Sequence, residues 1–182
     1  NASAGEVVTF GLAGRIELES YIQLHRDITI IGHSDSTTIA GAPGFRQSLF
    51  KMFQGQVVMR DVKLKDASND GENGQNSNRN GGGGGGGAGM GGAISMQSGD
   101  LSLIGVRIEN CYAIGGNGGN GNGSYGDIVG GGGNSIFGGG NASRYNHNAS
   151  RLLYGQNGGF GGGGSGSSYY KGGNGGFGGG GG

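Results

Sequence analysis

The side chains that could carry acid–base or metal chemistry in this chain are few and scattered. His25 and His33 stand near Asp27 and Asp35, and His147 is isolated. A hydrolytic or metal site needs such groups to converge with further ligands or a nucleophile, and no His-x-His or His-x-x-x-His spacing occurs. We interpret the histidines as exposed turn residues, and we predict no catalytic residue and no bound metal.

Four acidic residues are close in sequence and could in principle serve as acids or calcium ligands: Asp61, Asp66, Asp70 and Glu72. No nonapeptide calcium repeat recurs around them. The segment 66–72 is expected where a loop leaves the strand-rich part of the chain. We therefore favour a structural role for these carboxylates over an enzymatic one.

Cys111 is the only cysteine, so the chain has no intrachain disulfide and no multi-cysteine metal site. It aligns with Ala67 in the repeat described below, which favours buried packing over a reactive thiol. Matches to the Gly-x-Gly-x-x-Gly motif carry no weight, because the strand–helix context of a dinucleotide site is missing. We predict no cofactor, and no enzyme.

Aromatic residues occur in short inserts between glycine runs. They could stack on sugar rings, cap a packed bundle or form a local core, and the sequence leaves these alternatives open. The possible contact aromatics are Tyr125, Phe137, Tyr145, Tyr154, Tyr169 and Tyr170.

The composition excludes several classes of protein. Glycine supplies 52 of 182 residues, with one proline and no strict three-residue period, which excludes collagen. No apolar run approaches the ~18 residues that suggest a membrane span. Twelve basic and twelve acidic residues cancel, so nothing indicates nucleic acid or an anionic membrane as partner. A net charge near zero is compatible with a protein that assembles.

The sequence divides sharply by glycine content. Residues 1–80 hold nine glycines, and residues 81–182 hold the other 43. The first part carries short, alternating, β-branched runs such as 7–10, 15–18, 21–24 and 27–31, and no 3.6-residue apolar period persists. This pattern predicts an all-β segment with little or no helix.

Internal similarity identifies a repeat. Residues 50–55 match 94–99, and 62–67 match 106–111, at a shared offset of 44 residues; residues 27–32 also match 100–105. Each strand is too small to bury a core alone, so stacked turns of a β-solenoid are favoured. A sandwich with tight hairpins is the alternative. The expected core is Ile28, Ile30, Leu49, Met52, Val58, Val62, Leu64, Ile94, Met96, Leu101, Leu103, Val106 and Ile108.

The order of the motifs matches a known group. Gly14-Arg15-Ile16-Glu17-Leu18, Asp27-Ile28-Thr29-Ile30-Ile31-Gly32 and Val58-Met59-Arg60-Asp61-Val62-Lys63-Leu64 precede Gly91-Gly92-Ala93-Ile94. Over residues 5–114 the chain resembles bacterial secreted right-handed parallel β-helix proteins of the pectin-lyase-like and polymorphic-outer-membrane-protein type. The resemblance implies a right-handed parallel β-solenoid. Such helices serve as adhesins, surface fibres and polysaccharide-active enzymes, so the function stays open.

The glycine-rich runs admit two interpretations. Composition alone favours a disordered tail. Ordered polyglycine would instead adopt a polyproline-II-like conformation of three residues per turn, in which passes pack closely and satisfy one another's N–H and C=O groups. We predict such a polyglycine-II-like bundle, whose composition is similar to phage tail-fibre adhesin tips and to glycine–asparagine-rich bacterial surface proteins. The expected parts are solenoid (1–80), glycine pass (81–92), solenoid continuation (93–114) and glycine bundle (115–182).

A secreted, extracellular or cell-surface location is the expectation. The chain starts at Asn1 without a leader, so either a signal peptide has been removed or the sequence is a fragment, and we favour the removed signal peptide. Four Asn-x-Ser sequons, at Asn1, Asn122, Asn141 and Asn148, are compatible with secretion, although chance sequons are expected in so Asn- and Ser-rich a chain.

The leading functional hypothesis is a structural protein that polymerises with copies of itself into an extracellular filament. The alternative is an adhesin or receptor-binding tip that recognises a glycan or an outer-membrane protein; an ice-binding protein is more distant. Assembly is expected through Val7, Val8, Phe10 and Leu12, on a strand that either adds to a neighbouring subunit or forms the first coil of its own molecule.

Overall fold

The computed structural model describes residues 5–33, 36–77, 83–120, 134–135, 138–139, 157–158, 162–166, 174–175 and 180. The chain splits into two compact units. The first comprises Asn1–Asn69 and Gly91–Tyr112, and the second comprises Asp70–Met90 and Ala113–Gly182. The second unit thus begins at Asp70, eleven residues before the glycine pass expected at 81.

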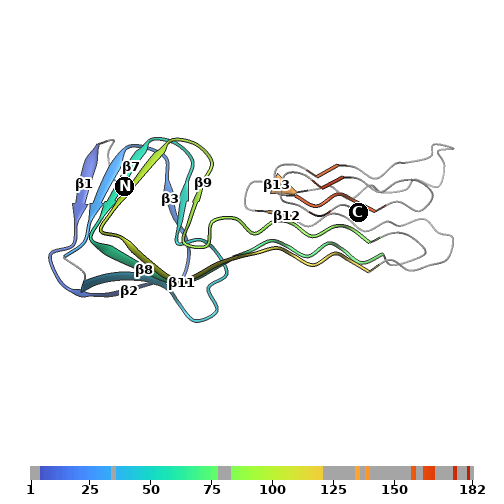
Figure 1. Ribbon diagram of the computed structural model, residues 1–182, viewed down its shortest axis with the longest axis horizontal. Helices are drawn as coiled ribbons and strands as arrows, with labels where there is room; N and C mark the ends of the chain where they lie inside the picture. The colour runs from blue at the N-terminus through green and yellow to red at the C-terminus, as the bar shows by residue number, and fades with distance from the viewer. Residues whose placement is uncertain are drawn as a thin grey trace. The chain divides into compact units, whose positions relative to one another are not determined.

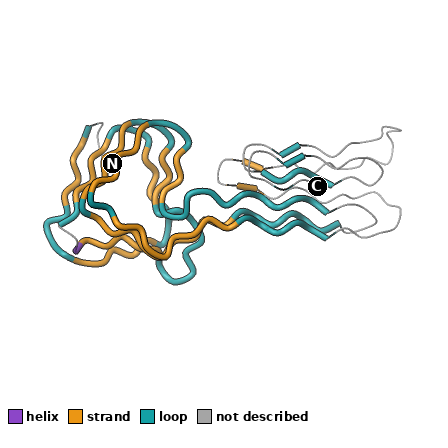
Figure 2. The backbone as a smooth tube through the Cα atoms, in the orientation of Figure 1, coloured by secondary structure: helices purple, strands orange, loops and turns teal. Residues whose placement is uncertain are grey.

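Secondary structure in the described residues is nearly all strand, as predicted (Figures 1 and 2). The strands are β1 (Glu6–Thr9), β2 (Gly14–Leu18), β3 (Ile22–Leu24), β4 (Ile28–Ile31), β5 (Thr37–Gly41), β6 (Phe50–Met52), β7 (Gln56–Arg60), β8 (Val62–Asp70), β9 (Ile94–Met96), β10 (Asp100–Ile104), β11 (Arg107–Ile114), β12 (Asn134–Ser135) and β13 (Gly138–Gly139).

Strands β1 to β11 form three sheets, and every pairing assigned within them is parallel. The first sheet has the order β1-β4-β7-β10, the second β11-β8-β5-β2, and the third β3-β6-β9. The chain therefore visits the three sheets in fixed rotation, and we call each circuit a coil. The rows of strands from successive coils are visible in Figure 1. Strands β12 and β13 pair antiparallel in the second unit.

The register confirms the repeat alignment. Asp100 pairs with Gln56 and Met96 pairs with Met52, both at the offset of 44 residues. The third match is confirmed through an intermediate strand, because Ile28 and Leu101 both pair with Val57. Residues that the sequence equated are therefore stacked neighbours in successive coils.

The bends of the coils recur at the same offset and share one backbone conformation. Gly55 and Gly99 have φ of 97° and 102°, and Asp66 and Asn110 have φ of 55° and 51°. At the corner between the first and second sheets, Asp61 has φ of 53° and the equivalent Gly105 has 62°. Glycine, Asn and Asp tolerate this left-handed region best, which explains their positions.

Inward-pointing residues of each sheet form columns of stacked apolar side chains, because in-register residues of parallel strands point to the same face. One column runs through Val8, Ile30, Met59 and Leu103. Five predicted core residues are buried: Ile30, Leu49, Met52, Val62 and Leu64. Four more pack partly buried against that core: Ile28, Ile94, Leu101 and Val106.

Val58 was wrongly predicted to be in the core. Val57 and Met59 are buried, and Val58 lies half-buried on the other face of β7. Two adjacent valines leave the alternation ambiguous in the sequence. The register decides it, since Met59 pairs with the buried Ile30.

Met96, Leu103 and Ile108 were expected in the core and are instead exposed, by 46%, 42% and 50%. Their in-register or repeat-equivalent partners Met52, Met59 and Leu64 are each 0% exposed. The difference is positional: β9, β10 and β11 are the last strands of their sheets, so no further coil covers these side chains.

The second unit contains extended passes (Figure 2). Backbone hydrogen bonds hold these passes together. The pass 113–120 runs parallel to 70–77: the N–H of Gly74 donates to Asn117 O at 2.8 Å, and that of Ser77 to Asn120 O at 2.9 Å. The pass 83–90 runs antiparallel to both, with Gly84 N–H donating to Gln75 O at 3.0 Å and Gly119 N–H donating to Gly84 O at 2.6 Å.

The glycine positions follow from the packing of these passes. In 70–77 every third residue is buried, namely Gly71, Gly74 and Ser77, whereas in the pass 83–90 all residues from Gly84 to Ala88 are buried. Further segments bond to this pass, since Gly85 N–H donates to Gly164 O and Gly180 N–H to Gly86 O, each at 2.9 Å. A pass enclosed on all sides has no direction in which a large side chain fits.

We expect the cost of truncating a methionine to depend on its coil. Met52→Ala should lower the free energy of unfolding by about 2–5 kcal/mol, because the side chain is fully buried. Met96→Ala, the matched change at the paired position on β9, the outermost strand of the same sheet, should cost markedly less in the dissociated subunit. Denaturant unfolding at low protein concentration measures both. Equal costs would contradict the column arrangement.

Substitution of glycine should discriminate between enclosed and open passes. A Cβ at Gly86 would lie 1.9 Å from Gly116 O, whereas one at Gly118 would have Gly84 O at 3.8 Å as its nearest neighbour. Gly86→Ala should therefore accelerate hydrogen exchange of the Gly116 and Gly119 amides, and Gly118→Ala should leave exchange near the wild-type rate. Unchanged protection in Gly86→Ala would refute the close packing of these passes.

Candidate functional site

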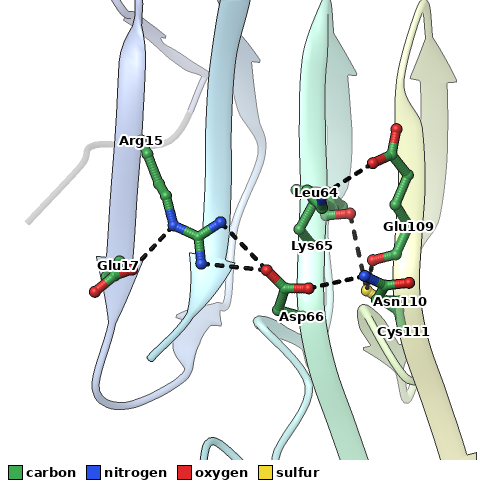
Figure 3. Close-up of polar contacts among 8 residues, drawn as sticks. All are labelled: Arg15, Glu17, Leu64, Lys65, Asp66, Glu109, Asn110 and Cys111. Atoms are coloured by element: carbon green, nitrogen blue, oxygen red, sulfur yellow. Dashed lines mark hydrogen bonds and ion pairs between the residues drawn. The ribbon is translucent and has the colours of Figure 1, made fainter. Parts of the chain in front are cut away.

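A polar cluster lies on the second sheet (Figure 3). Arg15 of β2 donates from both terminal nitrogens to Asp66 Oδ2 at 3.2 Å, and its Nε donates to Glu17 at 2.9 Å. Asn110 of β11 donates from Nδ2 to Asp66 Oδ1 at 3.2 Å. The Asp66 carboxylate therefore joins side chains from the first and last strands of the sheet.

Arg15 reaches past β5 because that strand offers little obstruction. Ala40 and Gly41 of β5 pair with Glu17 and Leu18 of β2, and both are small and buried. Gly41 is also required by a close backbone approach, since a Cβ there would lie 2.4 Å from the carbonyl oxygen of Asp66. The small residues of β5 thus permit the contact between β2 and β8.

The environment of Asp66 favours its anion. The hydrogen bond from Asn110, and after it the contact with Arg15, lower the pKa of the Asp66 carboxyl below its ordinary value despite some desolvation. The hydrogen bond of Arg15 with Glu17, and after it the one with Asp66, raise the pKa of Arg15. A carboxylate with both oxygens engaged and a lowered pKa is a poor proton donor, so this cluster is suited to holding strands together.

Glu109 and Cys111 complete the cluster. Glu109 pairs with Lys65 at 3.2 Å and lies 3.9 Å from Lys63. Cys111 is partly buried, with its Sγ 3.3 Å from Glu109 O and 3.8 Å from Leu64 O. Burial raises the pKa of the Cys111 thiol, which keeps it protonated. The packing role predicted for this residue agrees with its place against the core.

The remaining candidates for chemistry lie on separate elements. His25 stacks on Phe53 with ring centroids 4.6 Å apart, and the His33 backbone N–H donates to Thr37 Oγ1 at 2.8 Å. Asp61 occupies a corner, and Glu72 lies in the second unit, where its carbonyl accepts from Gly87. Across the described residues, no three or more His, Cys, Asp or Glu side chains come together as a metal site.

Two ends of the first unit form the other candidate site. The head end consists of β1, β2 and β3, and the tail end of β9, β10 and β11, which are the outermost strands of the three sheets. Exposed apolar residues gather on both: Val7, Leu12, Ile16 and Ile22 at the head, and Met96, Leu103, Ile104, Ile108 and Tyr112 at the tail.

The predicted assembly residues all lie at the head end. β1 pairs in register with β4 of its own chain, which corresponds to the alternative that this strand forms the first coil of its own molecule. Val7 is 56% and Leu12 83% exposed, whereas Val8 and Phe10 are half-buried. A role of these four residues in assembly stays a prediction.

The predicted contact aromatics lie outside the described residues. They are Tyr125, Phe137, Tyr145, Tyr154, Tyr169 and Tyr170, and the four sequons fall outside as well. The sequence pattern led us to assign assembly residues to the head end only, and to expect Met96, Leu103 and Ile108 of the tail end in the core. The signal of the tail end was present in the repeat, because the last copy of any stacked unit leaves its apolar positions uncovered.

Comparison of the chain with protein-family models, with curated proteins and with solved structures finds no match. The resemblance to secreted β-helix proteins therefore rests on motif order alone. No helix among the described residues has the length and apolarity needed to traverse a bilayer.

Removal of the Asn110 amide should raise the pKa of Asp66 toward its ordinary value. Asn110→Gly is the suitable change, because glycine accepts the left-handed backbone. Because the folded pKa is lowered, the contribution of Asp66 to stability is present above the unfolded pKa and is lost as pH falls through the folded one. Titration of the carboxyl carbon by NMR measures the shift; Glu109→Gln, which leaves both partners of Asp66 in place, should not reproduce it.

Proposed function

We propose that this chain is an extracellular structural protein that assembles head-to-tail into a filament, with no catalytic function. The observation that carries the proposal is the pair of uncovered ends on the first unit. Inward columns that are fully buried in the middle of the unit finish in exposed apolar side chains at the tail, such as Leu103 above Met59.

In the finer proposal, the first unit is a right-handed parallel β-solenoid and the second a polyglycine-II-like bundle. The fixed rotation through three sheets and the 44-residue register support the solenoid. The three-residue burial period of 70–77 supports the polyglycine-II conformation, which has three residues per turn.

Open ends favour polymerisation for two physical reasons. The outermost strands carry N–H and C=O groups that a further strand can pair, and solenoids that remain monomeric cover such edges with caps. The exposed apolar side chains add a hydrophobic contribution of about 25 cal/mol per Å² buried. A head-to-tail contact that does not close into a ring extends into a filament.

The extracellular setting is supported by composition. Glycine, asparagine and serine dominate the second half of the chain, and acidic and basic residues balance. Balanced charge removes the mutual repulsion that would keep copies apart. The proposed partners are therefore copies of the same chain.

Assembly should be visible directly. The purified protein should form filaments in negative-stain electron microscopy and show concentration-dependent mass by light scattering. Leu103→Asp should yield folded monomers, because a carboxylate at the top of an apolar column cannot be buried without large cost.

Ser102→Asp is the matched control for this variant. It introduces the same charge on the neighbouring exposed residue, whose side chain points to the opposite face of β10. Filaments of Ser102→Asp but not of Leu103→Asp would support the proposal. Wild-type protein that stays monomeric at every concentration, or Leu103→Asp filaments like those of wild type, would refute it.

A further inference from the structure

Strand β10 ends the first sheet at the tail, and β1 begins it at the head. Within the chain, the sheet is built by one repeated operation: β4 pairs on β1, β7 on β4 and β10 on β7, always parallel. The outer edge of β10 therefore presents the same strand direction, and the same side-chain faces, as the edge of β7 on which β10 itself pairs. The outer edge of β1 likewise matches the edge of β4 that pairs with β1.

The register of these pairings specifies which residues would meet across the two edges. Ser102 pairs with Val58, Val58 pairs with Thr29, and Thr29 pairs with Val7. The neighbouring inward column runs from Leu103 down to Val8. A further turn of the same operation would place the next Val7 beside Ser102 and the next Val8 over Leu103.

We infer that the partner of the tail end is the head end of a second copy, with β10 pairing parallel to β1 in a register that sets Ser102 opposite Val7. This inference rests on the proposed function and specifies its contact. Val8 of the second copy then covers Leu103, which is 42% exposed in the single chain.

The second sheet fits the same docking. There, Ile108 would meet the next Ile16 through the column of Leu64 and Ile39. One displacement of the second copy thus serves both four-stranded sheets. The third sheet has only three strands, so the same displacement leaves one strand position open between β9 and the next β3.

The head end also has room for side chains of the tail. A hollow of about 350 Å³ opens there between β1 and β2, lined by Thr9 to Ile16 and by Thr37. Gly14, Thr37 and Val62 are in register and form one column. The hollow exists because Gly14, the member of this column at the head end, has no side chain. Val106, the repeat equivalent of Val62, is the tail residue that this docking places over the hollow.

Charge on the outer face of the second sheet is compatible with the docking. Strands β2 and β11 carry the same triplet, Arg15-Ile16-Glu17 and Arg107-Ile108-Glu109. Stacked in register, like charges are adjacent, which is unfavourable, but each arginine also gains a diagonal glutamate within reach of its long side chain. Arg15 already makes such an oblique contact with Asp66 inside the chain.

Cysteine cross-linking tests the register. In a Cys111→Ala background, Ser102→Cys with Val7→Cys would place two Cα atoms about 4.8 Å apart across the contact, inside the ~4.4–6.8 Å range of disulfides. The matched control is Ser102→Cys with Thr9→Cys, on the same face but two residues along, where the Cα atoms would be about 8 Å apart. All three sites are exposed on the strands, so folding should persist, as circular dichroism would verify.

After mild oxidation, the Val7 pair should give a ladder of covalent multimers on a denaturing gel, at least tenfold more abundant than with the Thr9 pair. Filaments in which the Thr9 pair cross-links as well or better would overturn the register while leaving the proposed function intact. Filaments in which neither pair cross-links would show that another surface, or a glycine-rich segment, makes the contact. Wild-type protein that never associates would overturn both the inference and the proposed function.

Discussion

The structure depends on hydrogen bonds between backbone segments that are distant in sequence. Each strand of the first unit pairs with strands one circuit away, and each described pass of the second unit bonds to passes from other parts of the chain. A buried N–H or C=O group without a partner is costly, so no segment of either kind is stable alone. The stacking of successive passes is therefore the condition for folding, and side-chain packing is added to it.

The two units meet this condition with opposite kinds of residue. In the first, alternate positions hold large apolar side chains, and columns such as Ile39 and Leu64 fill the space inside the sheets. In the second, the passes lie too close together for side chains between them. On the open faces, asparagine side chains accept hydrogen bonds from the backbone of a neighbouring pass: Asn73 Oδ1 accepts from Asn117 N–H at 2.8 Å, and Asn157 Oδ1 accepts from Asn174 N–H at 2.9 Å. The abundance of both glycine and asparagine follows from this division.

Sequence reasoning predicted the features that repeat. The 44-residue offset, the parallel stacking and most core columns follow from pattern matching, because in-register sheets bring equivalent residues together. It failed where the pattern is ambiguous or ends. Val57 and Val58 are both apolar, so only pairing with β4 settles which is buried. The pass 70–77 was assigned to the strand-rich part because Glu72 and Gln75 mask its glycine period. The cluster around Asp66 depends on the left-handed backbone of Asp66 and Asn110, which no local sequence motif predicts.

The end coils link fold and function most directly. A column of stacked side chains stabilises each member from both sides, so its last residue always lacks one neighbour. A chain can cover that residue with a polar cap, or leave it apolar and rely on another molecule. Here Met96, Leu103 and Ile108 stay apolar at the tail, and Ile16 and Ile22 do so at the head, although their exposure costs stability in the single subunit. Association recovers that cost by mass action, because binding that favours the folded form stabilises it. The residues that make the isolated subunit less stable are thus the ones that give the proposed filament its cohesion.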